Sequence, residues 1–279
     1  MNNDSVEQEM PLTNPIDLFQ SGKLTDALAA ATNAVRNKPT DVGARSLLCE
    51  LLCFCGEFDR AEKQLDATLQ TDPQTMAGVS LLKHLIRSEL GRREVYRQGR
   101  VPEFLTIPTE AQKKRLEALL CLRNGQSADA ARLVSEASEL DVELSGDVDG
   151  VLFTEFLDLD DLLGPTLEVY TATGKYYWIG FEQIVSLEFN PVEHLSDMLW
   201  RSAAIETVGD VNGRIHVPAI YEGSETSSDE RIRIGRATEW KNGGADGPTR
   251  GAGQREFLVN DDVLPIMQIQ KLSFNHKTA

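Results

Sequence analysis

The chain of 279 residues has no long apolar run and is short of positive charge, histidine and cysteine. No stretch approaches the ~18 consecutive apolar residues that a bilayer-spanning helix needs. The first residues, MNNDSVEQEM, carry neither a basic flank nor an apolar core, so we expect no secretory signal. These absences argue against a membrane or exported protein, and we expect a cytoplasmic one.

Positive charge is scarce: 28 Lys and Arg stand against 44 Asp and Glu, which gives a formal net charge of −16. Between Leu133 and Gly174 there are eleven acidic residues and no Lys, Arg or His. A field of this sign repels phosphate backbones and anionic lipids, so nucleic acid and membrane surfaces are not expected partners. The stretch is typical of a solvated surface whose acids cap short helices. A weak cation site there is an alternative, although the spacing does not match a calcium-binding loop.

Residue patterns typical of catalysis or metal binding are also missing. The four histidines are scattered, and no GxSxG nucleophile motif occurs. The four cysteines lie in apolar segments, and no second cysteine pair occurs at the spacing of zinc ligands. This pattern indicates buried free thiols at Cys49, Cys53, Cys55 and Cys121. We therefore predict no catalytic, cofactor-binding or metal-binding residue, and no enzyme.

A Gly-rich loop is predicted over residues 242–253. Its end overlaps the run Arg250–Arg255, RGAGQR, which superficially resembles a phosphate-binding loop. Predicted strand follows the run, so no helix N-terminus would supply the amide groups that hold phosphate. The run is therefore interpreted as a structural turn, with anion binding as the alternative.

The N-terminal half repeats with a period of 34 to 35 residues, which is the tetratricopeptide spacing. The period is carried by four glycines, each expected to end the first helix of a unit: Gly22, Gly56, Gly91 and Gly125. Pro39 and Pro73 share the offset and stop second helices. Asn14 before Pro15 predicts a helix N-cap. A tetratricopeptide-like helical array is thus predicted over residues 14–140.

Such arrays present the first helix of each pair on a concave face, which can hold a peptide or a partner helix. The repeat register places six candidate contact residues there: Glu50, Phe54, Leu81, Leu85, Arg115 and Leu119. Packing of helix on helix is the alternative role for any one of them.

The second half is rich in β-branched and aromatic residues. Hairpins are predicted over 167–180 and around Asn212-Gly213, with strands at 185–189, 231–240, 255–259 and 265–272 and a short helix at 193–200. The predicted fold is α+β, with a helical repeat domain at residues 1–145 and a small antiparallel barrel or sandwich at residues 146–279. Because the Asp141–Gly150 linker is polar, we expect few contacts to cross it.

The order of several segments in the second half resembles the ImpE family, the accessory proteins of bacterial type VI secretion. These segments are FLDLDDLLGPTLEVYTATGKYYWIGFEQIVSLEF, LSDMLWRSAAIE, HVPAIYEGS, IRIGRATEW and GPTRGAGQREFLV. The resemblance implies a non-enzymatic cytoplasmic adaptor that binds the N-terminal helix of the small contractile-sheath subunit. It also implies a link between the sheath and its recycling ATPase.

Two alternatives to this function stay open. A general helical-repeat co-chaperone would bind unrelated peptides, and a metal-dependent hydrolase could lie in the β-rich part.

Overall fold

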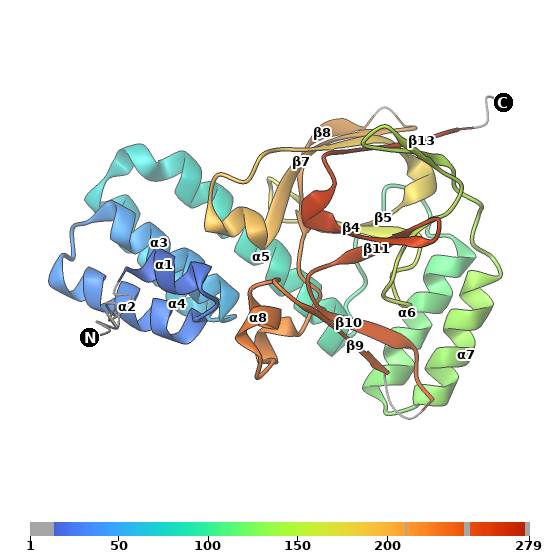
Figure 1. The fold of residues 1–279 in the computed structure, drawn as a ribbon, viewed down its shortest axis with the longest axis horizontal. Coiled ribbons are helices and arrows are strands. Elements are labelled where there is room, and N and C mark those ends of the chain that lie inside the picture. The colour runs from blue at the N-terminus through green and yellow to red at the C-terminus, as the bar shows by residue number, and fades with distance from the viewer. Residues whose placement is uncertain (1–13, 210, 243–245, 277–279) are drawn as a thin grey trace, which may run out of the picture.

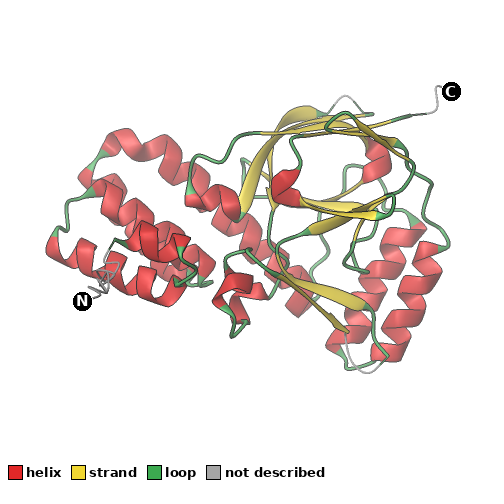
Figure 2. Cartoon of the chain, viewed as in Figure 1, coloured by secondary structure: helices red, strands yellow, loops and turns green. Residues whose placement is uncertain are grey.

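The computed structural model describes residues 14–209, 211–242 and 246–276 and confirms the α+β fold. Helices occupy the first half of the chain and antiparallel strands the second (Figures 1 and 2). No helix in these ranges is both long enough and apolar enough to cross a membrane.

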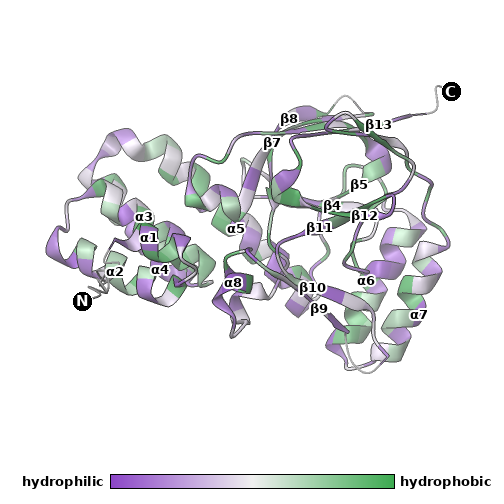
Figure 3. Ribbon diagram, viewed as in Figure 1, coloured by the Kyte–Doolittle hydropathy of each residue, from purple (hydrophilic) through white to green (hydrophobic). Residues whose placement is uncertain are grey.

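The first four helices form two antiparallel pairs, as the repeat predicts. They are α1 (Pro15–Gln20), α2 (Leu24–Asn37), α3 (Val42–Phe54) and α4 (Phe58–Thr71). The Asn14 side chain caps α1, with Pro15 at the first helical position. Gly22 and Gly56 adopt φ of +84° and +69°, as expected for glycines that end helices. Figure 3 shows apolar and polar residues mixed on each of these helices, as in helices that bury one side only.

The third repeat departs from the prediction. A single helix, α5 (Met76–Gln98), runs through Gly91 and ends at Gly99, whose φ is +87°. Gly91 instead lies where α5 meets the β-rich part: a Cβ there would be 3.9 Å from the Tyr176 Cβ. That separation is an ordinary van der Waals contact, so the packing here does not require glycine, and the place of Gly91 in the 34-residue series does not mark a helix end.

Two further helices, α6 (Glu110–Arg123) and α7 (Ser127–Ser138), form a hairpin around Gly125, whose φ is +74°. Figure 1 shows this hairpin on the opposite side of the molecule from α1–α4. It meets the end of α5, where the Arg123 Nη1 donates to the Val95 carbonyl oxygen at 2.9 Å. The predicted array over 14–140 is thus interrupted after α5.

Thirteen strands are described, in three antiparallel sheets. The eight-stranded sheet has the order β2-β1-β13-β6-β7-β8-β4-β5, and the others have the orders β12-β11-β3 and β10-β9. The strands are β1 (Gly146–Val148), β2 (Val151–Phe153), β3 (Phe156–Asp158), β4 (Thr166–Thr171), β5 (Tyr176–Gly180), β6 (Ile184–Phe189), β7 (Trp200–Thr207), β8 (Asn212–Pro218), β9 (Thr238–Asn242), β10 (Thr249–Gly253), β11 (Glu256–Val259), β12 (Asp262–Pro265) and β13 (Lys271–Phe274).

Several local predictions in this half are wrong. The predicted strand at 265–272 is interrupted by the 3₁₀ turn η5 (Ile266–Gln268), and residues 250–253 of the run interpreted as a turn belong to strand β10. The acidic stretch forms β1–β3, and the predicted strand at 231–240 begins as a short helix, α8 (Glu230–Arg233). The predicted helix at 193–200 is reduced to the 3₁₀ turn η3 (Leu195–Met198), after which β7 starts. Each of these segments is short, so tertiary pairing outweighs local preference.

The helical and β-rich parts share an apolar core. One cluster of buried side chains runs from Phe19 in α1 to Trp178 and Trp200 in the strands, while a second fills the space between the strands. The linker is anchored as well, because the Asn275 amide donates to the Ser145 carbonyl oxygen at 2.8 Å. The expectation of few contacts is therefore wrong, and the division at 145/146 stays a prediction.

We propose that the two parts unfold together. All three Trp residues lie in the β-rich part, whereas every helix longer than four residues in the described part of the chain ends by Ser138. Tryptophan fluorescence and far-ultraviolet circular dichroism should therefore give the same urea midpoint. Two separate midpoints would instead support independent domains.

Candidate partner-binding groove

The structure places most of the six predicted contact residues in the interior. Phe54, Leu85, Arg115 and Leu119 are buried, while Glu50 and Leu81 are partly exposed. Phe54 packs on Phe19 with ring centroids 4.9 Å apart. Phe54, Leu85 and Leu119 line none of the larger open grooves, and Arg115 contributes only a buried, internally paired side chain to one.

The chain itself covers the face on which these residues were expected. The Ser196 Oγ in η3 donates to the Glu50 Oε1 at 3.2 Å. From η4 (Ser224–Thr226), Glu225 pairs with Arg93 of α5 at 3.0 Å. The Thr25 backbone amide donates to the Glu230 Oε1 at 3.0 Å. Segments from the second half thus cover part of the concave face.

Arg115 and Leu119 lie apart from the other four, on α6. The Arg115 guanidinium donates from Nη1 to the Asp141 Oδ1 at 2.8 Å, within the linker. Both residues belong to the α6–α7 hairpin, which does not continue the stack of α1–α5 (Figure 1). The structure therefore does not assemble the six into one site.

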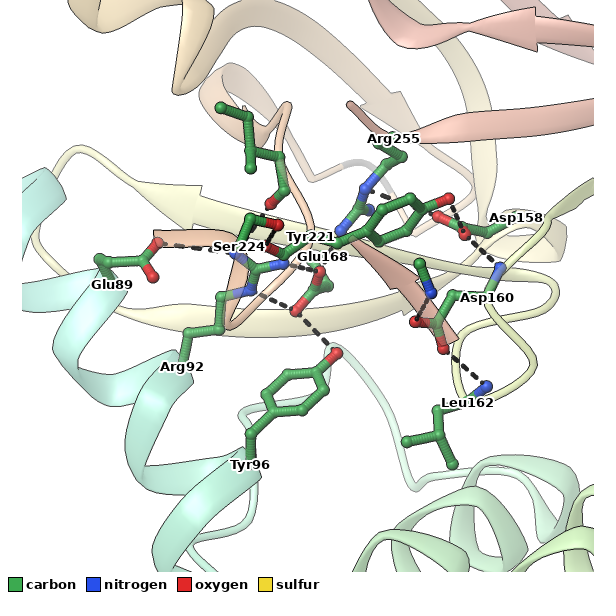
Figure 4. Close-up of polar contacts among 12 residues, drawn as sticks. Glu89, Arg92, Tyr96, Asp158, Asp160, Leu162, Glu168, Tyr221, Ser224 and Arg255 are labelled. Carbon is green, nitrogen blue, oxygen red and sulfur yellow. Dashed lines mark hydrogen bonds and ion pairs between the residues drawn. The ribbon is translucent and has the colours of Figure 1, made fainter. Parts of the chain in front are cut away.

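A buried polar network joins α5 to the strands (Figure 4). The Arg92 Nε and Nη2 donate to the two Glu168 carboxylate oxygens, each at 2.8 Å. Arg255 contacts the same carboxylate, and the Tyr96 hydroxyl donates to it at 3.2 Å. Burial would raise the pKa of Glu168, but Arg92 and Arg255 outweigh that effect and lower the pKa to about 2.

A second part of the network buries two carboxylates that were expected to be solvated. Asp160 accepts from the Arg250 Nε at 3.0 and 2.9 Å, and Asp158 accepts from the Tyr221 hydroxyl at 2.9 Å. Burial raises the pKa of Asp158 to about 7, although Arg255 lies 3.5 Å away. Because Arg250 and Arg255 are both paired internally, the RGAGQR run presents no free cation to an anion. Residues 243–245 of the Gly-rich loop lie outside the described ranges.

One groove remains open beside the helical repeat. It measures about 560 Å³ and lies between α1, α3 and the segment before β7. Its apolar lining consists of Ile16, Phe19, Leu47, Val192, Leu195 and Met198. Ile16 and Val192 are 42% and 46% exposed, so these apolar side chains face solvent.

Charged and polar groups surround this apolar lining. Glu50 and Glu193 supply acids, while Arg236 and His194 supply bases. Burial raises the pKa of Glu50, an effect that the hydrogen bond from Ser196 partly offsets. Of the six predicted contact residues, only Glu50 lines the groove.

Sequence reasoning missed the wall formed by residues 192–198. The signal was present in the text VEHLSDML, where Val192, Leu195 and Met198 follow a three-residue spacing. That spacing was interpreted as a helix of the β-rich part, because nothing local shows that it packs on α3. Among the described residues, no cluster of three His, Cys, Asp or Glu side chains could hold a metal ion.

Two family models match the chain. Residues 18–85 match the family described as tetratricopeptide repeat, and residues 150–273 match the family described as ImpE protein. The first match covers most of the helical pairs and the start of α5, and it ends before Gly91, at which α5 continues instead of ending as the repeat predicts.

Full-length comparisons agree with these matches. The chain is 29% identical over 263 residues to the type VI secretion system accessory component TagJ of Pseudomonas aeruginosa, covering 94% of this chain and 92% of that protein. The crystal structure of the protein VPA1032 from Vibrio parahaemolyticus superposes with a TM-score of 0.88 at 26% identity. That match covers 94% of this chain and 98% of the other.

Proposed function

Because the chain belongs to the ImpE family, we propose that it is a cytoplasmic, non-enzymatic adaptor of a type VI secretion system. Its partner is the small subunit of the contractile sheath, bound through that subunit's N-terminal helix. Through this contact the adaptor links the sheath to its disassembly and recycling machinery.

The observation that supports this proposal is the open groove on α1 and α3. An amphipathic helix docks by placing an apolar stripe in an apolar groove, with charges at the rim to set its direction. Exposed Ile16 and Val192 supply apolar contact from opposite walls. Glu50 and Arg236 offer charges of both signs at the rim.

The proposal predicts that Val192→Asp weakens binding of a peptide with the sequence of that sheath helix by about tenfold to a hundredfold, or about 1–3 kcal/mol. A carboxylate at this position would have to lose water against the apolar stripe of the peptide. Isothermal titration of the full-length protein measures the effect. Ile16→Asp should act in the same direction from the opposite wall.

The matched control is Val208→Asp, which changes a similarly exposed valine that does not line the groove. It should leave affinity unchanged. If the unmodified protein gives no heat with the peptide, the partner assignment fails. Unchanged affinity in Val192→Asp would refute the groove alone, and equal affinity for unrelated amphipathic peptides would favour a general peptide-binding protein.

A further inference from the structure

A small cavity lies where helix α6 meets the β-rich part. It measures about 60 Å³ and is lined by Gln112 and Arg115 of α6 and by Thr166 of β4. Gly180 at the end of β5 and Glu182 in the turn η2 (Phe181–Gln183) line it as well. The cavity is separate from the groove on α1 and α3, since the two share no lining residue.

Three side chains that line this cavity each carry a buried polar atom without a partner among the described residues. These atoms are the Gln112 Nε2, the Arg115 Nε and the Thr166 Oγ1. None of the three residues is more than 5% exposed. A buried polar group without a hydrogen bond is rare, because it costs free energy comparable to that of a lost bond. Three such atoms around one cavity therefore point to a bound molecule.

The remaining polar atoms of Gln112 and Arg115 hold these side chains in place. The Gln112 Oε1 accepts from the Thr109 amide at 3.1 Å, as part of the capping box of α6. The Arg115 Nη1 donates to the Asp141 Oδ1 at 2.8 Å. Neither side chain can turn towards another partner without breaking one of these contacts, so both free N–H groups stay at the cavity.

The donors and acceptors around the cavity select the kind of molecule. The free nitrogen atoms of Gln112 and Arg115 can only donate, so the bound molecule must accept hydrogen bonds, which a metal cation cannot do. Asp141 and Glu182 bring two acids to the cavity against the one guanidinium group, which disfavours an anion. No described cation pairs with Glu182, so its carboxyl group is also able to accept a bond. A neutral molecule that both accepts and donates fits these groups.

We propose that this cavity binds ordered water, which joins the α6–α7 hairpin to the sheet. One water molecule accepts from Gln112 and Arg115 and donates to Thr166, and the volume has room for about two molecules at ~30 Å³ each. Within the described ranges, no direct hydrogen bond connects α6 or α7 to any strand. The water supplies that polar connection, and it does not depend on the partner of the groove.

A crystal structure of the full-length protein at high resolution tests the site directly. We expect density for a water molecule within hydrogen-bond distance, about 3.2 Å or less, of at least two of the three unpartnered atoms. The proposal is wrong if these atoms have no water beside them, or if the side chains turn to bond with one another.

Thr166→Val tests the water in solution, because it replaces the hydroxyl with a methyl group of similar size. If the hydroxyl had no partner, the change would be neutral or stabilising, since it removes a buried polar group and breaks no bond. With water bound there, the change should lower the melting temperature by about 2–4 °C, the shift expected for one lost hydrogen bond in a protein of this size.

Thr207→Val provides the comparison, because Thr207 is also buried in a strand and has a known partner. Its hydroxyl donates to the Val211 carbonyl oxygen at 2.9 Å. This variant should melt below the unmodified protein by at least as much as Thr166→Val does. If Thr207→Val melts lower while Thr166→Val melts at or above the unmodified protein, the Thr166 hydroxyl has no bound water and the proposal fails.

Discussion

We expect Glu168→Gln to lower the free energy of unfolding by about 3–5 kcal/mol, the range for breaking one partner of a buried ion pair. Glu168 is fully buried and accepts from Arg92 and Arg255. Glutamine has almost the same shape but no charge, so two buried guanidinium groups would lose the carboxylate that they share and keep only the more distant Glu89 and Asp158. Urea unfolding at neutral pH, followed by circular dichroism, measures the change.

The destabilisation caused by Glu168→Gln should depend on pH, because the pKa of Glu168 differs between the folded and unfolded states. The pKa of Glu168 is lowered from 4.5 to about 2, so its ionised form stabilises the folded state above pH 4.5. That contribution is lost as the pH falls from 4.5 towards 2. The stability difference between Glu168→Gln and the unmodified protein should therefore shrink over this range.

The matched control is Glu110→Gln. Glu110 also pairs with a cation, Lys113, but on an exposed helix surface. The unfolding midpoint should not change, because exposed ion pairs contribute little. If Glu168→Gln had no more effect than this control, the network would not be a stabilising contact between α5 and β4.

The network also shows what the sequence could not reveal. Helix ends at Gly22 and Gly56 depend on local backbone preferences, and these were predicted correctly. The hairpin near Asn212-Gly213 exists, but both residues belong to β8 and pair with β7, so the predicted position of its turn is wrong. Arg92 and Glu168 lie 76 positions apart and belong to different parts of the chain. No local pattern indicates that these two residues meet, so the contact between the helical part and the β-rich part was not predicted.

The predicted groove failed for the same reason. Helical spacing identifies Phe54 and Leu85 as apolar positions on one face, but it does not say what covers that face. The cover comes from η3, α8 and η4, more than a hundred residues further along the chain. Where the covering segments stop, a smaller groove lined partly by Glu50 remains.

We expect Gly253→Ala to destabilise the protein by about 3 kcal/mol or more, because two independent costs add. Gly253 has a φ of +100°, which L-residues rarely adopt, at a cost of about 1–3 kcal/mol. A Cβ at this position would also lie 1.9 Å from the Ala237 carbonyl oxygen. That oxygen belongs to the backbone, so relief requires a shift of the chain, at a further cost of about 1–3 kcal/mol.

Gly213→Ala is the matched control, since Gly213 also lies in a strand but has open space around it and no positive φ. At roughly 2–4 °C per kcal/mol, the melting temperature of Gly253→Ala should lie about 10 °C below that of the unmodified protein. The melting temperature of Gly213→Ala should be close to that of the unmodified protein. Equal melting temperatures for the two variants would show that the chain at Ala237 can move aside. The expected difference would assign a structural role to Gly253, because this glycine lets two backbone segments approach each other. The arginines at the two ends of the RGAGQR run, Arg250 and Arg255, contact Asp160 and Glu168.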